Sequence, residues 1–333
     1  MTNPWSWYSD ADIARLEQER IFSCTWQYVG HAGQVADAGD FFTARAGRIP
    51  VVVTRAEDGD TRALVNVCRH RGSTVAEGAG NRKTLQCPYH AWTYGLDGRL
   101  RAAPRVDFDL DELQLVQMRL DSWGPFLFVN PDDDAPPLAE TLGELPAQVA
   151  EILDIDELVH HQTIRWNVDA NWKLVSENFL ECYHCAVAHP GFTELVDVSP
   201  DSYRLEEHRW FSSQFGSARA ADGELPRSQF HFVWPNTGIN IFPGRPNLSI
   251  GPIMPAGPER AERVLDYFFG ADADDRWISE LLELDDQIGR EDTALVERAQ
   301  RGVSAGVIAD GRLLGESERL VAHFQSLMRA ALG

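Results

Sequence analysis

The spacing of hydrophobic and polar positions changes character along the 333-residue chain. Apolar residues at helical spacing follow Ser9 and predict an N-terminal helix. From about residue 26 to residue 105, short runs of β-branched and aromatic residues alternate with turn dipeptides such as Asp97-Gly98, a pattern typical of β-hairpins. Residues 1–120 therefore predict one helix and an all-β domain, with the core of that domain at about 26–105.

The rest of the chain, residues 121–333, mixes helical and strand patterns. An acidic, proline-rich segment at 131–137 has no periodicity and is expected to be a loop. Helices are expected at about residues 138–153, 170–186, 273–300 and 313–331, and strands at about 158–169, 203–217, 229–254 and 262–270. This order predicts a second domain, of α+β class, with an antiparallel sheet.

Composition and charge narrow the functional classes. The formal net charge of −21, from 30 basic and 51 acidic residues, disfavours binding to phosphate backbones and to anionic membranes. No apolar stretch reaches the roughly 18 residues of a transmembrane helix, and the first residues lack the features of a signal peptide. Five cysteines are too few for a disulfide scaffold. We therefore expect a cytoplasmic protein that binds neither nucleic acid nor membrane.

Two of the cysteines are each followed closely by a histidine. One residue separates Cys68 from His70, two separate Cys87 from His90, and 16 residues lie between the pairs. Turn residues beside both pairs predict loops that could converge on one metal centre. Zinc accepts two Cys and two His ligands, but its usual spacing pairs Cys with Cys and His with His. The observed order favours a Rieske [2Fe–2S] cluster, because each loop then supplies one thiolate and one imidazole.

A second group of metal-binding residue types lies further along the chain. His184 is expected near a helix end, and the Pro-Gly pair after His189 should bend the chain so that both imidazoles lie together. Two histidines and one carboxylate, with open positions, suit mononuclear non-haem iron. Glu181 is the near carboxylate, whereas Asp292 lies in the apolar stripe of a predicted helix, where a buried charge needs a partner. Glu291 faces polar neighbours and is the poorer candidate. From spacing alone, ordinary core or rim positions remain open for these residues.

Two other features have structural explanations. Cys182 and Cys185 form a C-x2-C motif inside a predicted helix, with no second pair, so we expect buried structural cysteines instead of a redox or zinc site. The aromatic segment 229–236 is expected to be sheet core, with a pocket wall for an ammonium group as the alternative.

The motifs around these residues resemble those of one family. Segments 66–72 and 87–94 resemble the Rieske domain of ring-hydroxylating oxygenase α-subunits, although the family usually has Gly where Ala91 stands. The run Glu-Asn-Phe-Leu-Glu-Cys-Tyr-His at 177–184, with a His-Pro pair after four further residues, resembles the iron motif of the same subunits. The resemblance implies a Rieske [2Fe–2S] domain followed by a helix-grip (START-like) catalytic domain. It implies the cluster ligands Cys68, His70, Cys87 and His90, and the Fe(II) ligands His184, His189 and Asp292.

The resemblance also gives a role to Glu181. In the family, an acidic residue three positions before the first iron-ligating histidine bridges to a Rieske histidine of the neighbouring subunit. Glu181 would then bridge to His90 of another copy, in a head-to-tail homotrimer. Most members that hydroxylate aromatic rings have Asp at this position. Glu181 more closely resembles the branch that acts on carnitine, glycine betaine, stachydrine and choline.

The resemblance implies a terminal oxygenase, an oxidoreductase that incorporates molecular oxygen. The sequence has no flavin or nicotinamide motif, so electrons from NAD(P)H would arrive through a separate reductase of flavin or ferredoxin type. We expect hydroxylation or N-demethylation of a small organic substrate, with quaternary amines or betaines favoured. An aromatic-ring dioxygenase and a non-enzymatic, zinc-stabilised ligand-binding module are the alternatives. The sequence leaves open the substrate and the presence of a β-subunit.

Overall fold

The computed structural model describes residues 2–106, 110, 113–220 and 223–333. The chain folds into two compact units. The β unit is Phe22–Leu138, and the α+β unit combines the residues before it with Ala139–Gly333. This division differs from the one expected at residue 120. The N-terminal helix packs with the α+β unit, and two strands near residue 120 complete the main sheet of the β unit.

The β unit holds a seven-stranded and a three-stranded antiparallel sheet within its described residues. The larger sheet has the order β1-β10-β9-β4-β3-β2-β5, and the smaller one the order β6-β7-β8. The strands are β1 (Gln27–His31), β2 (Asp40–Ala46), β3 (Ile49–Arg55), β4 (Thr61–Val65), β5 (Ala79–Asn81), β6 (Thr84–Gln86), β7 (Thr93–Gly95), β8 (Leu100–Ala102), β9 (Gln117–Trp123) and β10 (Phe126–Asn130), with a 3-10 helix at Ala32–Val35.

The core of the β unit holds two loops in place. Successive valines of β3 are fully buried on both faces of the sheet, so this strand is covered on both sides. The loop at 66–78 connects β4 to β5, and the loop at 87–92 connects β6 to β7. These loops carry the two Cys-His pairs, as their turn residues predicted.

The α+β unit is built on one antiparallel sheet of seven strands, counted over its described residues. Its order is β11-β17-β16-β15-β14-β13-β12. The strands are β11 (Leu158–Val168), β12 (Arg204–Glu207), β13 (Phe211–Ser217), β14 (Arg227–Val233), β15 (Thr237–Ile241), β16 (Asn247–Gly257) and β17 (Arg260–Gly270). The fold class expected from the sequence is confirmed, because an all-β unit is followed by an antiparallel sheet with helices.

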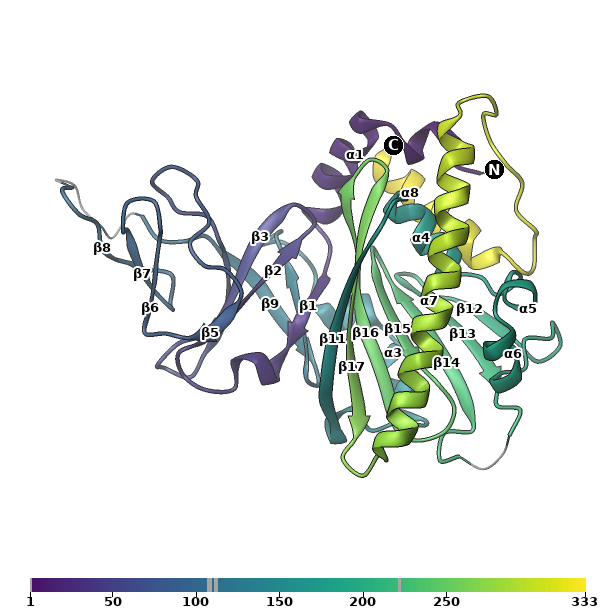
Figure 1. Ribbon diagram of the computed structural model, residues 1–333. Coiled ribbons are helices and arrows are strands. Elements are labelled where there is room, and N and C mark those ends of the chain that lie inside the picture. Colours follow the sequence, from purple (N-terminus) through teal and green to yellow (C-terminus); the bar gives the residue numbers. More distant parts are fainter. Residues whose placement is uncertain (1, 107–109, 111–112, 221–222) are drawn as a thin grey trace. The chain divides into compact units, whose positions relative to one another are not determined.

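The long α7 crosses one face of this sheet (Figure 1). Leu265 and Tyr267 of β17 pack there against Ile278 of α7. The helices are α1 (Ala11–Glu17), α2 (Leu138–Leu142), α3 (Leu145–Ala150), α4 (Trp172–Phe179), α5 (Cys185–Ala188), α6 (Pro190–Leu195), α7 (Asp275–Ser304) and α8 (Arg319–Leu332), with 3-10 turns at Trp5–Tyr8 and Ile155–Glu157 and a π-helical turn at Gln18–Phe22. No helix among the described residues is both long enough and apolar enough to span a membrane.

The helix expected at 170–186 is interrupted. It ends at Phe179 and resumes only for the single turn of α5. The cause is Glu181, whose Oε2 accepts hydrogen bonds from the backbone N–H groups of Tyr183 and His184 at 2.6 and 3.2 Å. A side chain that bonds nearby backbone N–H groups competes with helical hydrogen bonding and starts a new turn. The same segment could not be recognised as irregular from its 3.6-residue spacing.

The N-terminal residues are tied to α4 by buried polar contacts. The carboxylate of Glu17 accepts hydrogen bonds from Lys173 Nζ and, at 2.8 Å, from Trp172 Nε1, and all three side chains are buried. The hydroxyl of Tyr8 donates to Glu177 at 2.7 Å. Burial raises the pKa of Glu177 to about 7, although the hydrogen bonds that it accepts oppose this shift. These contacts fix the helix from which the metal-binding segment continues.

Candidate metal centres and substrate cavity

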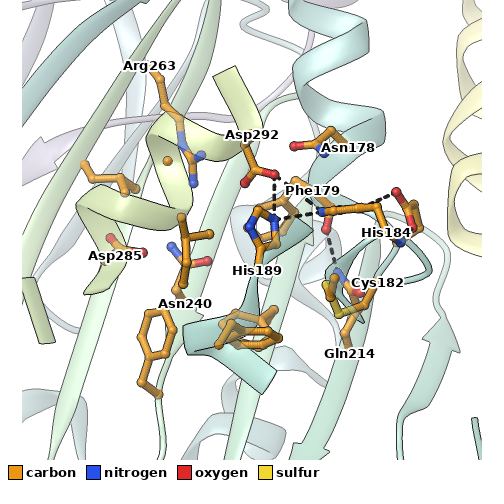
Figure 2. Close-up of a pocket in the computed structure, with 18 of the residues that line it drawn as sticks. Asn178, Phe179, Cys182, His184, His189, Gln214, Asn240, Arg263, Asp285 and Asp292 are labelled. Carbon is orange, nitrogen blue, oxygen red and sulfur yellow. Dashed lines mark hydrogen bonds and ion pairs between the residues drawn. A yellow bond between two sulfur atoms is a disulfide. The ribbon is translucent and has the colours of Figure 1, made fainter. Parts of the chain in front are cut away.

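Three side chains from two separate parts of the α+β unit converge in front of the sheet (Figure 2). His184 precedes α5, His189 follows it, and Asp292 projects from α7. Nε2 of His189 lies 3.1 Å from Nε2 of His184 and 2.9 Å from Oδ1 of Asp292, and the remaining side of this triangle is 3.4 Å. The turn at His189 therefore brings the two imidazoles together, as the sequence predicted.

The geometry of this triad fits a metal ion. Among the described residues, it is the one group of three or more His, Cys, Asp or Glu side chains with ligand atoms all within 4.8 Å of one another. Ligands at about 2.1 Å from a metal and at right angles to each other are about 3 Å apart. The three observed separations lie close to this value, so the residues could occupy one face of an octahedron and leave the opposite face open.

The charges of the site also favour a cation. Burial raises the pKa of Asp292, but hydrogen bonds from His184 and His189 outweigh it and hold this pKa at about 2. Burial lowers the pKa of His184, but hydrogen bonds to Asp292 and Glu181 raise it overall, to about 9. The triad thus holds an ionised carboxylate beside two imidazoles that are stabilised as cations. A divalent ion would take the place of the two imidazole protons.

Two glutamates orient the imidazoles from outside the triad. Glu181 accepts a hydrogen bond from Nδ1 of His184. Glu291 accepts one from Nδ1 of His189 at 2.7 Å, and the amide of Gln287 donates to its other oxygen at 2.9 Å. Each contact directs Nε2 of the imidazole toward the triad. The contact between Glu291 and Gln287 agrees with the polar neighbours that the sequence predicts for Glu291. The sequence did not predict the contact between Glu291 and His189.

The two cysteines beside this site do not behave as expected. Cys185 is buried, as expected, but Cys182 is half-buried, and the two are joined by a disulfide that the sequence did not predict. The sequence offered a signal in the C-x2-C spacing, but the motif was assigned to an unbroken helix. Because the helix ends at Phe179, the two side chains can approach each other across a turn.

The triad opens into a cavity of about 670 Å³, part of which is open to solvent. Three of its phenylalanines, Phe192, Phe230 and Phe242, pack with ring centroids 5.4–6.4 Å apart. The aromatic residues that line the cavity are Trp166, Phe179, Phe192, Tyr203, Phe230 and Phe242. The sequence left two roles open for segment 229–236, sheet core and pocket wall, and the segment has both. Phe230 lines the cavity, while Phe232 packs in the core against Phe324.

The second candidate centre lies in the β unit. Cys68 and Cys87 are buried thiols, whereas His70 and His90 are exposed, with ring centroids 4.5 Å apart. The hydroxyl of Tyr94 lies 3.4 Å from Sγ of Cys68. The four described side chains do not form a compact group around one point. This arrangement disfavours a single tetrahedral zinc ion, whose ligand atoms would lie within about 4 Å, and fits a two-iron cluster with buried thiolates and outward imidazoles.

The loop after Cys87 contains a backbone conformation that favours glycine. Ala91 has φ of 58°, in the left-handed region, and its N–H bonds to the carbonyl of Cys87 at 3.1 Å. A non-glycine residue in this region costs about 1 kcal/mol. Ala91 is the position at which the resembled family usually has Gly, so its backbone retains the turn that the glycine would form.

Comparison with known protein families identifies the domains that bind these two kinds of cofactor. Residues 155–333, more than half of the chain, match the family described as "Ring hydroxylating alpha subunit (catalytic domain)", and residues 25–114 match the "Rieske [2Fe-2S] domain". The chain belongs to the ring-hydroxylating oxygenase α-subunit family. This Rieske oxygenase therefore carries the two cofactors of its family, a [2Fe–2S] cluster and a mononuclear iron.

Similar proteins point to one branch of Rieske oxygenases. The chain is 33% identical to the carnitine monooxygenase oxygenase subunit of Escherichia coli (strain K12), over 98% of this chain and 92% of that protein. It is 31% identical to the chloroplastic choline monooxygenase of Arabidopsis thaliana, over 98% and 82% of the two chains. The solved structure of the quaternary ammonium Rieske monooxygenase CntA with L-carnitine matches with a TM-score of 0.87 and 29% identity, over 100% and 96% of the chains.

These findings confirm the expected reaction type. The protein is a terminal oxygenase, an oxidoreductase that uses O2 and electrons from a partner reductase on a small organic substrate. The predicted resemblance to the quaternary-amine branch is confirmed by its relatives. The non-enzymatic, zinc-stabilised module is not supported.

Proposed function

We propose that this oxygenase hydroxylates a small quaternary amine at a carbon next to nitrogen. The observation that carries the proposal is the His184–His189–Asp292 triad, which opens into a cavity with an aromatic wall. Aromatic faces attract quaternary ammonium groups through the negative charge of their π systems. The similarity to proteins that act on carnitine and choline supports the same substrate class.

The proposal assigns each metal ligand. His184, His189 and Asp292 hold the mononuclear iron, which supplies oxygen activation when it is bound. The [2Fe–2S] cluster is held by Cys68, His70, Cys87 and His90. The buried thiols and outward imidazoles support this assignment, because the imidazoles then face an incoming partner.

Glu181 is proposed to connect the two centres between copies of the chain. Its side chain is 13% exposed and hydrogen-bonded to His184, so it could also contact His90 of the partner subunit. A head-to-tail trimer would place a cluster from one copy beside the iron of the next. Support comes from a related quaternary ammonium Rieske monooxygenase, whose structure is described as giving insight into inter-subunit electron transfer.

The proposed reaction balances as follows. One oxygen atom of O2 enters a C–H bond of the substrate, and the other leaves as water after uptake of two electrons and two protons. Hydroxylation of the carbon next to the ammonium gives a hemiaminal, which collapses to an amine and a carbonyl compound. A reacting N-methyl group would be released as formaldehyde.

Substrate-dependent oxygen uptake tests the proposal. The purified oxygenase would be combined with NADH and a Rieske-type reductase, and given carnitine, glycine betaine, choline or an aromatic acid. We expect one or more quaternary amines to increase oxygen uptake and to yield an aldehyde and an amine in equal amounts. Oxidation confined to the aromatic acids, with formation of diols, would contradict the proposal and favour a ring dioxygenase.

A further inference from the structure

One cation of the cavity has no anionic partner. Arg263 projects from β17 into the cavity on the same side of the triad as Asp285, as Figure 2 shows. Its guanidinium lies over the ring of Trp166, 5.3 Å from the centroid. Among the described residues, this guanidinium has no hydrogen-bond or ion-pair partner. The side chain is half-buried, so water can replace only part of the missing interactions.

Asp285, an acid of the same cavity, does not form an ion pair with Arg263. Asp285 of α7 accepts a hydrogen bond from the hydroxyl of Tyr267 at 2.5 Å and forms no ion pair with Arg263. Burial raises the pKa of Asp285, and the positive charge of Arg263 only partly opposes that shift. The cavity therefore contains a guanidinium with unused donors close to a carboxyl group that is already hydrogen-bonded elsewhere.

We infer that Arg263 binds the carboxylate of a zwitterionic quaternary amine and selects betaine-type substrates over amino alcohols. The inference rests on the proposed quaternary-amine function and narrows it. A guanidinium presents parallel N–H donors that match the two oxygens of a carboxylate. The aromatic wall of Phe192, Phe230 and Phe242 offers a separate surface to the ammonium group. One molecule with both charges can satisfy the two surfaces together.

The charge of the cavity agrees with such a ligand. A choline-like alcohol adds a positive charge to a space that already contains Arg263, and its hydroxyl supplies one acceptor to a donor group that can use two. A betaine has no net charge and supplies a bidentate acceptor. The expected discrimination therefore comes from charge as well as from hydrogen bonding.

Equilibrium binding to the oxidised holoenzyme tests the inference without turnover. Four probes form two matched pairs: glycine betaine with choline, and their analogues 3,3-dimethylbutyrate and 3,3-dimethylbutanol, in which an uncharged tert-butyl group replaces the trimethylammonium. Calorimetry would measure the Kd of each probe for the wild type, Arg263→Gln and Arg263→Lys. We expect Arg263→Gln to weaken both carboxylates by about 10- to 100-fold and to leave the uncharged 3,3-dimethylbutanol within about twofold. Choline should bind as tightly as before or more tightly, because a like charge has been removed. Arg263→Lys should recover part of the loss, because it keeps the charge but not the planar fork.

Arg260→Gln is the matched control. Arg260 lies on the same strand but is 64% exposed and paired with Asp169 at 3.3 Å, so its removal should leave all four Kd values unchanged. Equal weakening of carboxylates and alcohols in Arg263→Gln would show that Arg263 has a structural role and would overturn the inference. Unchanged carboxylate binding in this variant would also overturn it. So would a wild-type protein that binds neither carboxylate. If the wild type binds 3,3-dimethylbutyrate through Arg263 but neither ammonium compound, Arg263 is a carboxylate site, but the betaine preference and the proposed quaternary-amine function both fail. If glycine betaine binds equally well to the wild type and to Arg263→Gln, the inference fails alone and the proposed function stands.

Discussion

Oε2 of Glu291 lies 2.7 Å from Nδ1 of His189 and accepts a hydrogen bond from it. The next residue, Asp292, approaches the other nitrogen of the same imidazole, at 2.9 Å from Nε2. Consecutive carboxylates of α7 therefore act on opposite sides of one imidazole. The first fixes the orientation of the ring, and the second lies on the side where a metal would bind.

Asp292→Ala should remove the mononuclear iron and leave the cluster. This substitution takes away the anionic ligand of the triad, while the cluster ligands lie in the other unit of the chain. Metal analysis should show a decrease from about three to about two iron atoms per chain, with unchanged acid-labile sulfide. Unaltered iron content would refute Asp292 as a ligand.

Glu291→Gln should weaken the same iron site without abolishing it. The amide keeps the size of the side chain but is a weaker acceptor for Nδ1 of His189, so iron affinity should fall about 10- to 100-fold. Titration of the iron-depleted protein with Fe(II) would measure this change. The control is Glu283→Gln, an exposed glutamate on the same helix. If both variants bind iron like the wild type, the contact with His189 does not orient the ligand.

Glu181→Gln should separate electron transfer from metal binding. The cluster spectrum should remain close to wild type, because the cluster ligands lie in the other unit, and saturation with Fe(II) before the measurement offsets the weaker orientation of His184. Stopped-flow measurement should show slower oxidation of the reduced cluster in the presence of substrate and O2, by about 10- to 100-fold. Wild-type rates in this variant would show that the carboxylate is not needed as a bridge.

Glu177→Gln should change how stability depends on pH. The pKa of Glu177 is raised from the usual 4.5 to about 7 by burial, so the folded state binds its proton more tightly than the unfolded state. Its stabilising contribution is complete below pH 4.5 and is lost as the pH rises through 7. Between pH 6 and 8.5 the wild type should lose about 1 to 2 kcal/mol that the variant retains. Unfolding at both pH values, with exposed Glu280→Gln as the control, measures the difference; parallel curves would contradict it.

Thiol counting tests the disulfide. Cys24, Cys68 and Cys87 are outside it, so three thiols per chain should react with an alkylating agent after unfolding without a reductant. Prior reduction should increase the number to five, the total in the sequence. Five reactive thiols in both samples would show that Cys182 and Cys185 are reduced in solution. Peptide mass analysis would locate the modified residues.

Sequence patterns could predict the features that depend on local periodicity. The hairpins of the β unit follow from turn dipeptides, and Asp292 was recognisable because a carboxylate interrupts an apolar stripe. The contact between Glu291 and His189 could not be read in this way, because it joins positions 102 residues apart. Helical spacing describes one element, and this contact depends on how two elements pack.

Side-chain competition with the backbone explains why the helix expected at 170–186 is interrupted. The spacing predicts a helix that continues beyond Phe179, but Glu181 bonds to backbone N–H groups that a helix would use.

Arg263 was not predicted as a cavity residue, although the alternation of residues along its strand could have indicated it. It shares the inward face of β17 with Leu265 and Tyr267, where a charged residue is unusual.

The chain order of the two units has a consequence for dissecting this enzyme. The β unit is an insertion between residue 21 and residue 139 of the unit that contains the triad. A truncation that removes everything before residue 139 would therefore also remove Tyr8 and Glu17, and leave Lys173 and Glu177 buried without them. An isolated catalytic fragment requires excision of the insertion and rejoining of its two ends, so a single cut cannot produce it.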